Sequence, residues 1–301
     1  MRVLLALGGN AMTNADGRAR PEDQIAAAEV AMRSVAELLQ HDVDVVVTHG
    51  NGPQVGNLLV KNELAAAVVP PVPLDWCGAQ TQATLGFVLL DTLDAALTAA
   101  GVLRRTAAVV TRTVVDSDDP GFAHPTKPIG RYLPADEAKL LVEHGETWED
   151  RGEKGWRRVV ASPEPLEIVD APAVQALVEA GFVVVANGGG GIPHVRDGEG
   201  NLHGVEAVID KDLGAALLAR SVDADVLVVA TDVAHEWFIR LRGMGVALLD
   251  TMTILDTDDH HARAQATGTA SDLLLSLWGR QRAESVVVTG DPRLFTALRT
   301  G

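Results

Sequence analysis

The chain is poor in cysteine and in basic residues, and each shortage excludes a class of protein. Cys77 is the single cysteine among 301 residues. One cysteine forms no internal disulfide and no multi-cysteine metal cluster, which excludes the disulfide-stabilised secreted class and fits a reducing compartment. We therefore interpret Cys77 as a small buried apolar residue, and we expect a cytoplasmic location.

Acidic residues outnumber basic ones. The sequence has 41 Asp and Glu against 25 Lys and Arg, which gives a formal net charge of −16. This excess opposes binding of nucleic acid or of an anionic membrane by the surface as a whole. A phosphate site in this protein must therefore be local, and we expect neither nucleic acid nor membrane as a partner.

Several sequence signals are missing. No apolar run reaches the ~18 residues that a membrane-spanning helix needs, and the apolar stretch 3–7 is too short for a signal peptide and predicts a buried strand instead. The absence of GxxxxGK[ST] excludes the P-loop, and the absence of GxSxG removes support for Ser–His–Asp hydrolysis. No His/Glu or Cys/His spacing predicts a metal site built by the protein. The pair His260–His261 lies beside acidic residues, an arrangement that is typical of a solvated turn.

Short apolar runs rich in β-branched residues alternate with helical stretches. Most of these runs are continuously apolar, which is the pattern of strands buried on both faces of a parallel sheet. The predicted strands are 3–7, 43–48, 107–115, 182–186, 225–231 and 285–289, and the predicted helices are one that begins at Pro21, 53–67, 78–100, 171–180, 211–220 and 262–279. Hydrophobic residues make up 47% of the chain, enough for a sizeable core. The alternation predicts a three-layer α/β/α sandwich with an open, mainly parallel sheet.

Residues 116–165 interrupt this alternation. They are rich in Asp, Glu, Pro, Trp and Arg, and a structureless loop of this length is uncommon inside a compact domain. We therefore expect a small inserted lobe at 116–165 that covers the substrate, within a single domain at 1–301. Residues 1–220 would form mainly the acid-binding half and residues 221–301 mainly the nucleotide-binding half.

Three of the predicted strands end in small, flexible residues. These are Gly8, Gly9 and Asn10 after the first strand, Gly50, Asn51 and Gly52 after the second, and Gly188 to Gly191 after 182–186. In open α/β sheets ligands bind beyond the carboxyl ends of the strands, so these turns would line one crevice. Glycine-rich turns and helix N-termini bring backbone N–H groups close to an anion, which makes phosphate the natural ligand.

Two lysines are candidates for neutralising charge during phosphoryl transfer. Lys127 in HPTKPIG lies between two prolines, which restrict the backbone and orient the side chain. Lys211 lies in DKD, where Asp210 and Asp212 flank it. For either lysine alone, a solvated surface charge is the simpler interpretation. The flanking prolines favour a functional role of Lys127 over that interpretation.

Eight segments together resemble the carbamate kinases, members of the amino acid kinase family. They are ALGGNAM, VTHGNGPQVGNLL, DWCGAQTQATLG, PTKPIG, GWRRVVASPEP, NGGGGIP, GVEAVIDKDL and ADVLVVATDV, and they cover residues 1 to about 235. The resemblance implies an open α/β/α sandwich, usually a homodimer. It also implies reversible phosphoryl transfer between carbamoyl phosphate and ADP, which gives ATP and carbamate, with Mg²⁺ carried by the nucleotide. The predicted helix 78–100 is equally consistent with a dimer interface and with ordinary packing inside one chain.

The resemblance also implies roles for individual residues. Gly8, Gly9, Asn10, Gly50, Asn51 and Gly52 would hold the small acid and the moving phosphoryl group. Lys127 and Lys211 would neutralise the developing charge, with Asp212 holding the lysines in place. Gly189, Gly190 and Asp232 would bind the nucleotide. The attacking group is already a carboxylate oxygen, so no general base is needed, and the inserted lobe would exclude water.

The C-terminal portion departs from the family pattern. Members carry a Gly-Ser-Met-Gly-Pro-Lys motif whose lysine reaches the nucleotide phosphates, whereas the best counterpart here, 268–273, places Leu273 at that position. Loss of one such donor typically costs ~3 kcal/mol, about a hundredfold in rate. Arg240, Arg242 and Arg263 are candidate replacements.

Three functions are therefore open at this point. The first is a kinase for carbamate. The second is a catalytically weakened homologue that binds a small phosphorylated metabolite as a sensor or subunit. The third is a kinase for another small acid or with another phosphoryl donor.

Overall fold

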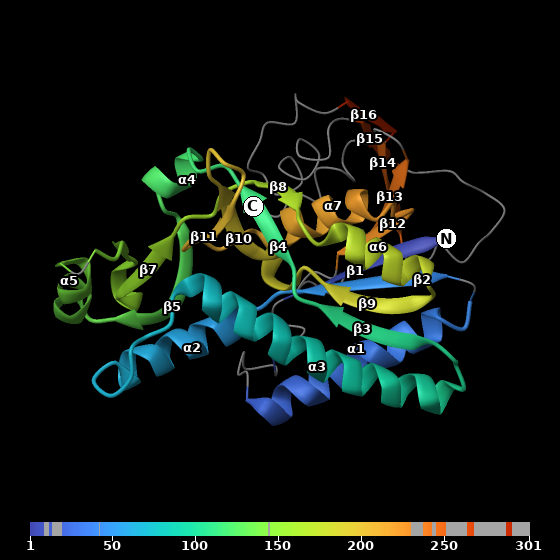
Figure 1. The fold of residues 1–301 in the computed structure, drawn as a ribbon, viewed down its shortest axis with the longest axis horizontal. Coiled ribbons are helices and arrows are strands. Elements are labelled where there is room, and N and C mark those ends of the chain that lie inside the picture. The colour runs from blue at the N-terminus through green and yellow to red at the C-terminus, as the bar shows by residue number, and fades with distance from the viewer. Residues whose placement is uncertain are drawn as a thin grey trace.

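A twisted β-sheet runs through the centre of the protein (Figure 1). The structure is a computed structural model that describes residues 1–8, 12–13, 20–41, 43–143, 145–229, 237–242, 245–250, 264–267 and 287–290. In this part of the chain the sheet has nine strands in the order β16-β15-β14-β13-β12-β1-β2-β9-β3. Their bounds are β1 Arg2–Leu7, β2 Asp44–His49, β3 Arg105–Val109, β9 Phe182–Ala186, β12 Val226–Val229, β13 Trp237–Arg242, β14 Gly245–Asp250, β15 Ala264–Thr267 and β16 Val287–Gly290.

The strands from β12 to β3 form the parallel part of the sheet. β1 pairs in parallel with β12 and β2, and β9 pairs in parallel with β2 and β3. From β12 onward β13, β14, β15 and β16 add antiparallel strands. Parallel strands must be connected by crossovers, which the helices supply. Consequently the carboxyl ends of β1, β2 and β9 lie at one edge of the sheet.

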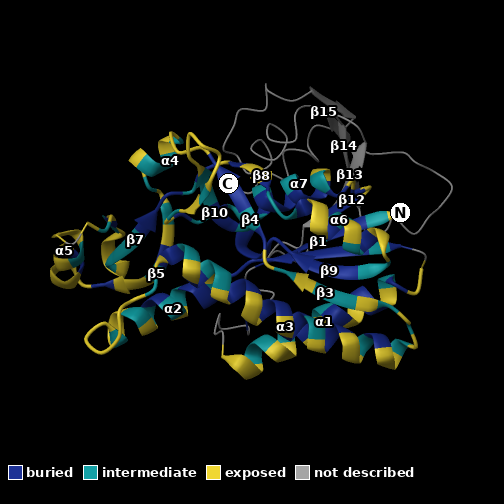
Figure 2. Cartoon of the chain, viewed as in Figure 1, coloured by how far each residue is buried: buried dark blue, intermediate teal, exposed yellow. Residues whose placement is uncertain are grey.

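Helices cover both faces of the sheet (Figure 1). On one face α1 (Pro21–Leu38) and α3 (Leu74–Ala100) pack Met32, Leu85 and Leu89 against the strands, and on the other face α6 (Ala171–Glu179) and α7 (Lys211–Ser221) pack Val174 and Leu218. Figure 2 shows the strands buried between these two layers while the outward faces of the helices are exposed. The predicted three-layer α/β/α sandwich is confirmed.

Local sequence explains where these helices begin and end. Pro21 occupies the first turn of α1, with Glu22 and Asp23 beside the positive end of the helix dipole. α3 ends at Gly101, whose φ of 65° is the left-handed conformation that favours glycine at a helix C-terminus. α7 begins after Asp210, whose carboxylate accepts a hydrogen bond from the Asp212 N–H at 3.0 Å.

Two smaller sheets lie beside the central one. One has the order β11-β10-β4-β8, and the other, β5-β7-β6, lies at the left of Figure 1 together with α5. Between β2 and α3, α2 connects the central sheet to this side of the molecule. The bounds are α2 Gly52–Ala65, β4 Arg112–Val115, α4 Pro120–Ala123, β5 Lys127–Leu133, α5 Ala135–Glu143, β6 Trp148–Asp150, β7 Trp156–Val160, β8 Pro165–Ile168, β10 Ile192–Arg196 and β11 Leu202–Gly204. Two short 3₁₀ turns cover Gly152–Lys154 and Gly188–Gly190.

Three sequence predictions need correction. The run 107–115 is two strands in different sheets, β3 and β4, because Gln82 bonds the backbone of Thr111 between them. The predicted helix 262–279 contains the strand β15 in its described part. Finally, α3 is long and apolar enough by length and composition to cross a membrane. Its buried side chains pack against α1 and the sheet, which is the arrangement of a core helix.

Candidate functional site

The carboxyl ends of β1, β2 and β9 lie next to one another at one edge of the sheet. Leu7 lies opposite His49 in the register, and the Gly50 N–H donates to the Leu7 carbonyl at 3.0 Å. On the other side of β2, Val47 pairs with Val185. Gly8 is buried at the end of β1, whereas Gly9 and Asn10 lie outside the described residues.

The turn after β2 and the turn after β9 pack directly against each other. A Cβ atom on Gly189 would overlap the carboxamide of Asn51, and a Cβ atom on Gly188 would overlap the ring of His49. Gly189 also has a φ of 66°, which disfavours any other residue. Glycine at these two positions lets two backbones approach closely. The result is a surface of backbone groups of the type that cradles an anion.

Asn51 is the residue directly before α2, and residues of α3 fix its side chain. Its Nδ2 donates to Thr81 Oγ1 at 2.9 Å, and Thr81 Oγ1 in turn donates to the Gly78 carbonyl at 2.7 Å. Gly52 is exposed at the first position of α2, and a Cβ there would meet nothing within 4 Å. The N-terminus of α2 therefore faces the site with a rigid Asn51 and an open Gly52.

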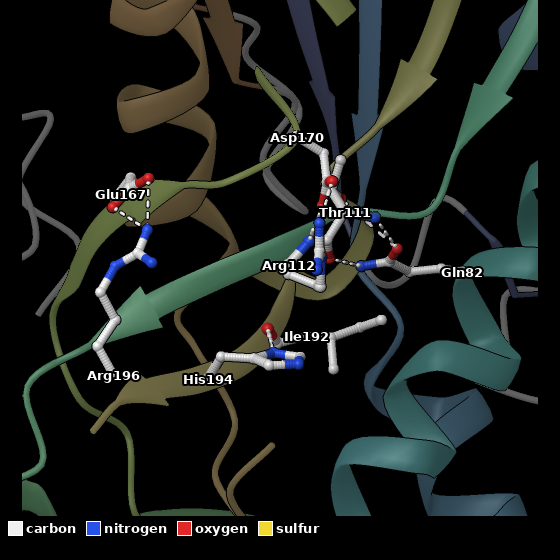
Figure 3. A network of polar contacts seen from close by, with 8 residues as sticks. All are labelled: Gln82, Thr111, Arg112, Glu167, Asp170, Ile192, His194 and Arg196. Atoms are coloured by element: carbon white, nitrogen blue, oxygen red, sulfur yellow. Dashed lines mark hydrogen bonds and ion pairs between the residues drawn. The ribbon is translucent and has the colours of Figure 1, made fainter. Parts of the chain in front are cut away.

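A polar network holds the glycine turn after β9, and Figure 3 shows the part of it around Thr111 and Arg112. Gln82 Nε2 donates to the Gly188 carbonyl at 3.0 Å and to the Thr111 carbonyl at 3.2 Å, and its Oε1 accepts from the Thr111 N–H at 2.9 Å. Arg112 makes a two-point contact with Asp170, with Nη2 to Oδ1 at 2.7 Å and Nε to Oδ2 at 3.1 Å. These bonds fix the backbone of Thr111, Arg112 and Gly188 at the glycine turn.

Asn187 precedes the glycines in the left-handed conformation, with a φ of 56°. Its carbonyl accepts from Thr48 Oγ1 at 2.9 Å, and its N–H donates to Thr111 Oγ1 at 2.8 Å. A non-glycine residue in this region is disfavoured and persists where its surroundings over-determine it. The hydrogen bonds with Thr48 and Thr111 hold Asn187 in this conformation.

The two candidate lysines occupy neighbouring ion pairs. Lys127, the first residue of β5, places Nζ 3.1 Å from Asp210 Oδ2, and Lys211 Nζ lies 2.6 Å from Asp212 Oδ1. Asp212 thus contacts Lys211, while Asp210, which sequence reasoning noted only as a flank, holds Lys127. Burial raises the pKa of the Asp212 carboxyl, and Lys211 opposes that rise. The first pair joins Lys127 of β5 to Asp210, directly before α7, and the second lies in the first turn of α7.

His49 is a buried titratable group within the site that sequence reasoning missed. Its Nδ1 lies 3.0 Å from the Gly50 carbonyl and is the nitrogen that donates. Burial lowers the pKa of His49, so its imidazole is neutral at pH 7. The position of His49 directly before the Gly50–Gly52 turn was the sequence signal that could have identified it. Gln82 and Asp210 reach the site from other elements, and no sequence signal pointed to them.

A cavity of about 620 Å³ opens between these turns and β5. Asn51, Gly52, Gly189 and Lys127 line it together. Gly190 packs against Ile209, where a Cβ would come within 2.9 Å, and its role in binding the nucleotide stays a prediction. Of the residues predicted to bind the acid, the structure therefore brings Asn51 and Gly52 to one cavity with Lys127 and Gly189, whereas Gly8 and Gly50 are not part of its lining.

Other predicted residues lie beyond this region. Asp232, Arg263 and Leu273 are outside the described residues, and so is the pair His260–His261. Arg240 and Arg242 belong to β13. Within the described ranges, no group of three or more His, Cys, Asp or Glu side chains is placed to hold a metal ion.

Comparison with known proteins relates this chain to a family of kinases. The model of the amino acid kinase family matches residues 1–235. The chain is 46% identical to the carbamate kinase-like protein YahI of Escherichia coli, over 77% of this chain and 74% of that protein. It is 42% identical to the carbamate kinase of Trichomonas vaginalis, over 77% and 75%. Among solved structures, the carbamate kinase of Giardia lamblia bound to AMP-PNP superposes with a TM-score of 0.73 at 38% identity, covering 78% of this chain and 75% of that one.

Proposed function

The chain belongs to the amino acid kinase family and is a carbamate kinase-like phosphotransferase, and from this premise we propose that it transfers a phosphoryl group reversibly between carbamoyl phosphate and ADP. The observation that carries the proposal is the cavity on which Lys127, Asn51, Gly52 and Gly189 converge. This arrangement supplies a cation and backbone donors to one small anion. Phosphoryl transfer needs little more from a protein than such positioning and charge stabilisation.

The reaction follows from the groups at the site. An oxygen of the ADP β-phosphate attacks the phosphorus of carbamoyl phosphate, the bond from phosphorus to the carbamate oxygen breaks, and carbamate leaves with that electron pair. In the reverse direction a carbamate oxygen attacks the γ-phosphorus of ATP. Both nucleophiles are already anions, so no side chain has to remove a proton.

Each group at the site has a part in this step. Lys127 and Lys211 neutralise charge on the transferring oxygens, and Asp210 and Asp212 fix the two ammonium groups through contacts of 3.1 and 2.6 Å. Backbone N–H groups of Asn51 and Gly52 and of Gly188 and Gly189 bind the oxygens of the acid and of the phosphoryl group. Mg²⁺ arrives with the nucleotide as part of the substrate.

Binding of a nucleotide is supported by the Giardia lamblia carbamate kinase, whose structure holds AMP-PNP. In this chain we assign the nucleotide to the side of the glycine turns that faces β12, with Asp232 at its border. The same resemblance supports a homodimer and a cytoplasmic location. Sedimentation velocity of the purified protein, with a chain mass of 31.7 kDa, tests the dimer.

Two observations favour a second candidate function. The family match ends at residue 235 of 301, and Leu273 stands where family members carry a lysine. A weakened homologue that binds a phosphorylated metabolite without turnover would account for both. A kinase for a different small acid would account for them as well if its nucleotide contacts differ.

An assay of ATP formation from carbamoyl phosphate, ADP and Mg²⁺ separates these functions. The proposed function predicts ATP formation by the wild-type protein. Binding of carbamoyl phosphate without ATP formation, together with activity gained in Leu273→Lys, supports the weakened homologue. ATP consumption with another small acid but not with carbamate supports the third function.

A further inference from the structure

The segment 206–210 leads from β11 to α7 and contacts the chain that forms the three-stranded sheet β5-β7-β6. Three of its residues line the cavity, and Lys211 follows it directly. The three-stranded sheet carries Lys127 at the start of β5. Contacts that fix this sheet on the segment therefore fix the positions of Lys127 and Lys211 relative to each other.

Two contacts join the middle and the end of this segment to the chain of the three-stranded sheet. Ala161, directly after β7, forms a parallel bridge with Ala207, and the Val208 N–H donates to the Ala161 carbonyl at 3.0 Å. At the end of the segment, Asp210 contacts Lys127 at 3.1 Å. The sheet thus meets the segment through one backbone contact and one ion pair.

Glu206 makes a third contact, at the beginning of the segment. Its Oε1 accepts a hydrogen bond at 3.1 Å from the N–H of Leu74, the first residue of α3. Its Oε2 lies 3.8 Å from Nη2 of Arg158 on β7. The N-terminus of a helix stabilises a carboxylate, so α3 holds Glu206 in place while its second oxygen faces the three-stranded sheet.

Arg158 lies between two carboxylates. Its Nη1 is 3.2 Å from Glu146 Oε1, between α5 and β6, and its Nη2 faces Glu206. The Arg158 side chain is 18% exposed, and its Nε is buried without a hydrogen-bond partner among the described residues. A guanidinium with this little access to water needs its carboxylates to offset the loss of hydration. Arg158 is therefore held by Glu206 rather than free in solvent.

An apolar cluster lies between the three-stranded sheet and the helices. Ile129 and Val160 of the sheet pack there with Val55 of α2 and Leu74 of α3, and Val208 packs against them. Apolar burial is non-directional, so this cluster resists separation without fixing the orientation of the sheet. The ion pairs at the two ends of the segment 206–210 are directional contacts and supply that orientation.

We propose that Arg158 and Glu206 are positioning residues for phosphoryl transfer: their ion pair holds the three-stranded sheet in the orientation that places Lys127 in the cavity. The inference rests on the proposed function, because it takes Lys127 to neutralise charge on the transferring oxygens. Neither Arg158 nor Glu206 belongs to the described lining of the cavity. They act on the reaction through Lys127.

Steady-state kinetics of Glu206→Gln test the proposal. Glutamine keeps an oxygen that accepts from the Leu74 N–H and removes only the charge opposite Arg158. We expect kcat/KM for carbamoyl phosphate to fall about twofold to fivefold, the effect of a partly exposed ion pair. KM for ADP should not change, because we assign the nucleotide to the side of the glycine turns that faces β12. Arg151→Gln is the matched control, since Arg151 pairs with Glu149 inside the same sheet, and both constants should stay at the wild-type values.

A double-mutant cycle shows whether Arg158 and Glu206 act as a pair. Arg158→Gln breaks the same contact, so adding Glu206→Gln to it should cause no further fall in kcat/KM for carbamoyl phosphate. Circular dichroism shows that each variant is folded, and Glu206→Gln alone remains decisive if Arg158→Gln is not. Unchanged kcat/KM in Glu206→Gln, or a full second fall in the double variant, overturns the proposal. So does a rise in KM for ADP as large as the fall in kcat/KM.

Hydrogen exchange of the Val208 N–H measures the same contact without catalysis. This N–H bonds to the Ala161 carbonyl, so its exchange requires that the two segments separate. Arg158→Gln is expected to speed the exchange about twofold to fivefold, and Arg151→Gln is expected to leave it unchanged. Equal exchange rates in the wild-type protein and in Arg158→Gln overturn the proposal.

The kinetic and exchange measurements together distinguish this inference from the proposed function. Exchange at Val208 that depends on Arg158, in a protein that forms no ATP, supports the positioning of the sheet by this ion pair and counts against the proposed function. ATP formation with the same kcat/KM in the wild-type protein and in Glu206→Gln supports the proposed function and overturns the positioning role.

Discussion

Lys127 Nζ and Asp210 Oδ2 lie 3.1 Å apart although 83 positions separate the two residues in the chain. The pair joins β5 to the N-terminus of α7. It brings the ammonium group that lines the cavity next to the Lys211–Asp212 pair. The orientation of Lys127 thus depends on a carboxylate from a different element.

Asp210→Asn tests this dependence. Asparagine caps helices as well as aspartate does, so the Asp212 N–H keeps its acceptor and only the charge opposite Lys127 is removed. We expect kcat for ATP formation to fall about tenfold to a hundredfold, because small misplacement of a catalytic group has effects of this order. Steady-state kinetics measure it, with Asp136→Asn on the exposed part of α5 as the control. Unchanged kcat in Asp210→Asn would show that Lys127 is positioned by other groups.

Gly189→Ala tests the contact between the two glycine turns. The substitution places a methyl group against the Asn51 carboxamide at a φ of 66°, so we expect a loss of about 1–3 kcal/mol in the free energy of unfolding together with loss of activity. Urea denaturation measures the stability. Gly198→Ala is the matched control, because a Cβ there meets nothing within 4 Å. Equal denaturation midpoints for the two variants would contradict the packing described.

Gln82→Leu tests the network under the glycine turn. It removes two donated and two accepted bonds. The carbonyls of Thr111 and Gly188 keep the N–H groups of Ile192 and Gly191 as donors, whereas the Thr111 N–H loses its acceptor. One buried group left unsatisfied costs about 1–3 kcal/mol, so we expect destabilisation of that order. Gln80→Leu, on the exposed face of the same helix, should change stability far less. The account fails if both variants melt at the wild-type temperature.

His49 predicts a pH dependence of stability with a definite sign. Burial lowers the folded-state pKa of His49 below its ordinary value of 6.5, so the unfolded chain takes up a proton that the folded chain refuses. The contribution is present above pH 6.5 and is lost as the pH falls from there toward the folded-state pKa, by up to about 1.4 kcal/mol per pH unit. We therefore expect the stability difference between wild type and His49→Asn to shrink between pH 7.5 and pH 5.5. A difference that stays constant over this range would show that His49 does not titrate differently in the two states.

The fold was largely predictable because burial leaves a regular pattern. The continuous apolar run of β9 was predicted with the bounds that the structure shows, Phe182–Ala186, and the layers followed from the alternation of strands and helices. The run 107–115 was predicted as one strand because residue type does not reveal that Gln82, from a distant helix, interrupts it at Thr111.

The site was predictable only in part. Glycine turns and a proline-flanked Lys127 are local signals, and among the residues that line the cavity they identified Asn51, Gly52, Lys127 and Gly189. Gln82 and Asp210 act through partners distant in sequence, so their contributions depend on which elements the fold brings together. The roles given to Asp232 and Leu273 remain predictions, since both residues lie outside the described part of the chain.

Phosphorus NMR of the reaction mixture tests the central claim most directly, because it distinguishes transfer from hydrolysis. With carbamoyl phosphate, ADP and Mg²⁺, we expect the wild-type protein to convert the carbamoyl phosphate signal into the signals of ATP. We expect Lys127→Ala to do so at least about a hundredfold more slowly, and Lys139→Ala to do so at the wild-type rate. Consumption of carbamoyl phosphate to inorganic phosphate alone, or equal rates in Lys127→Ala and wild type, would contradict the account.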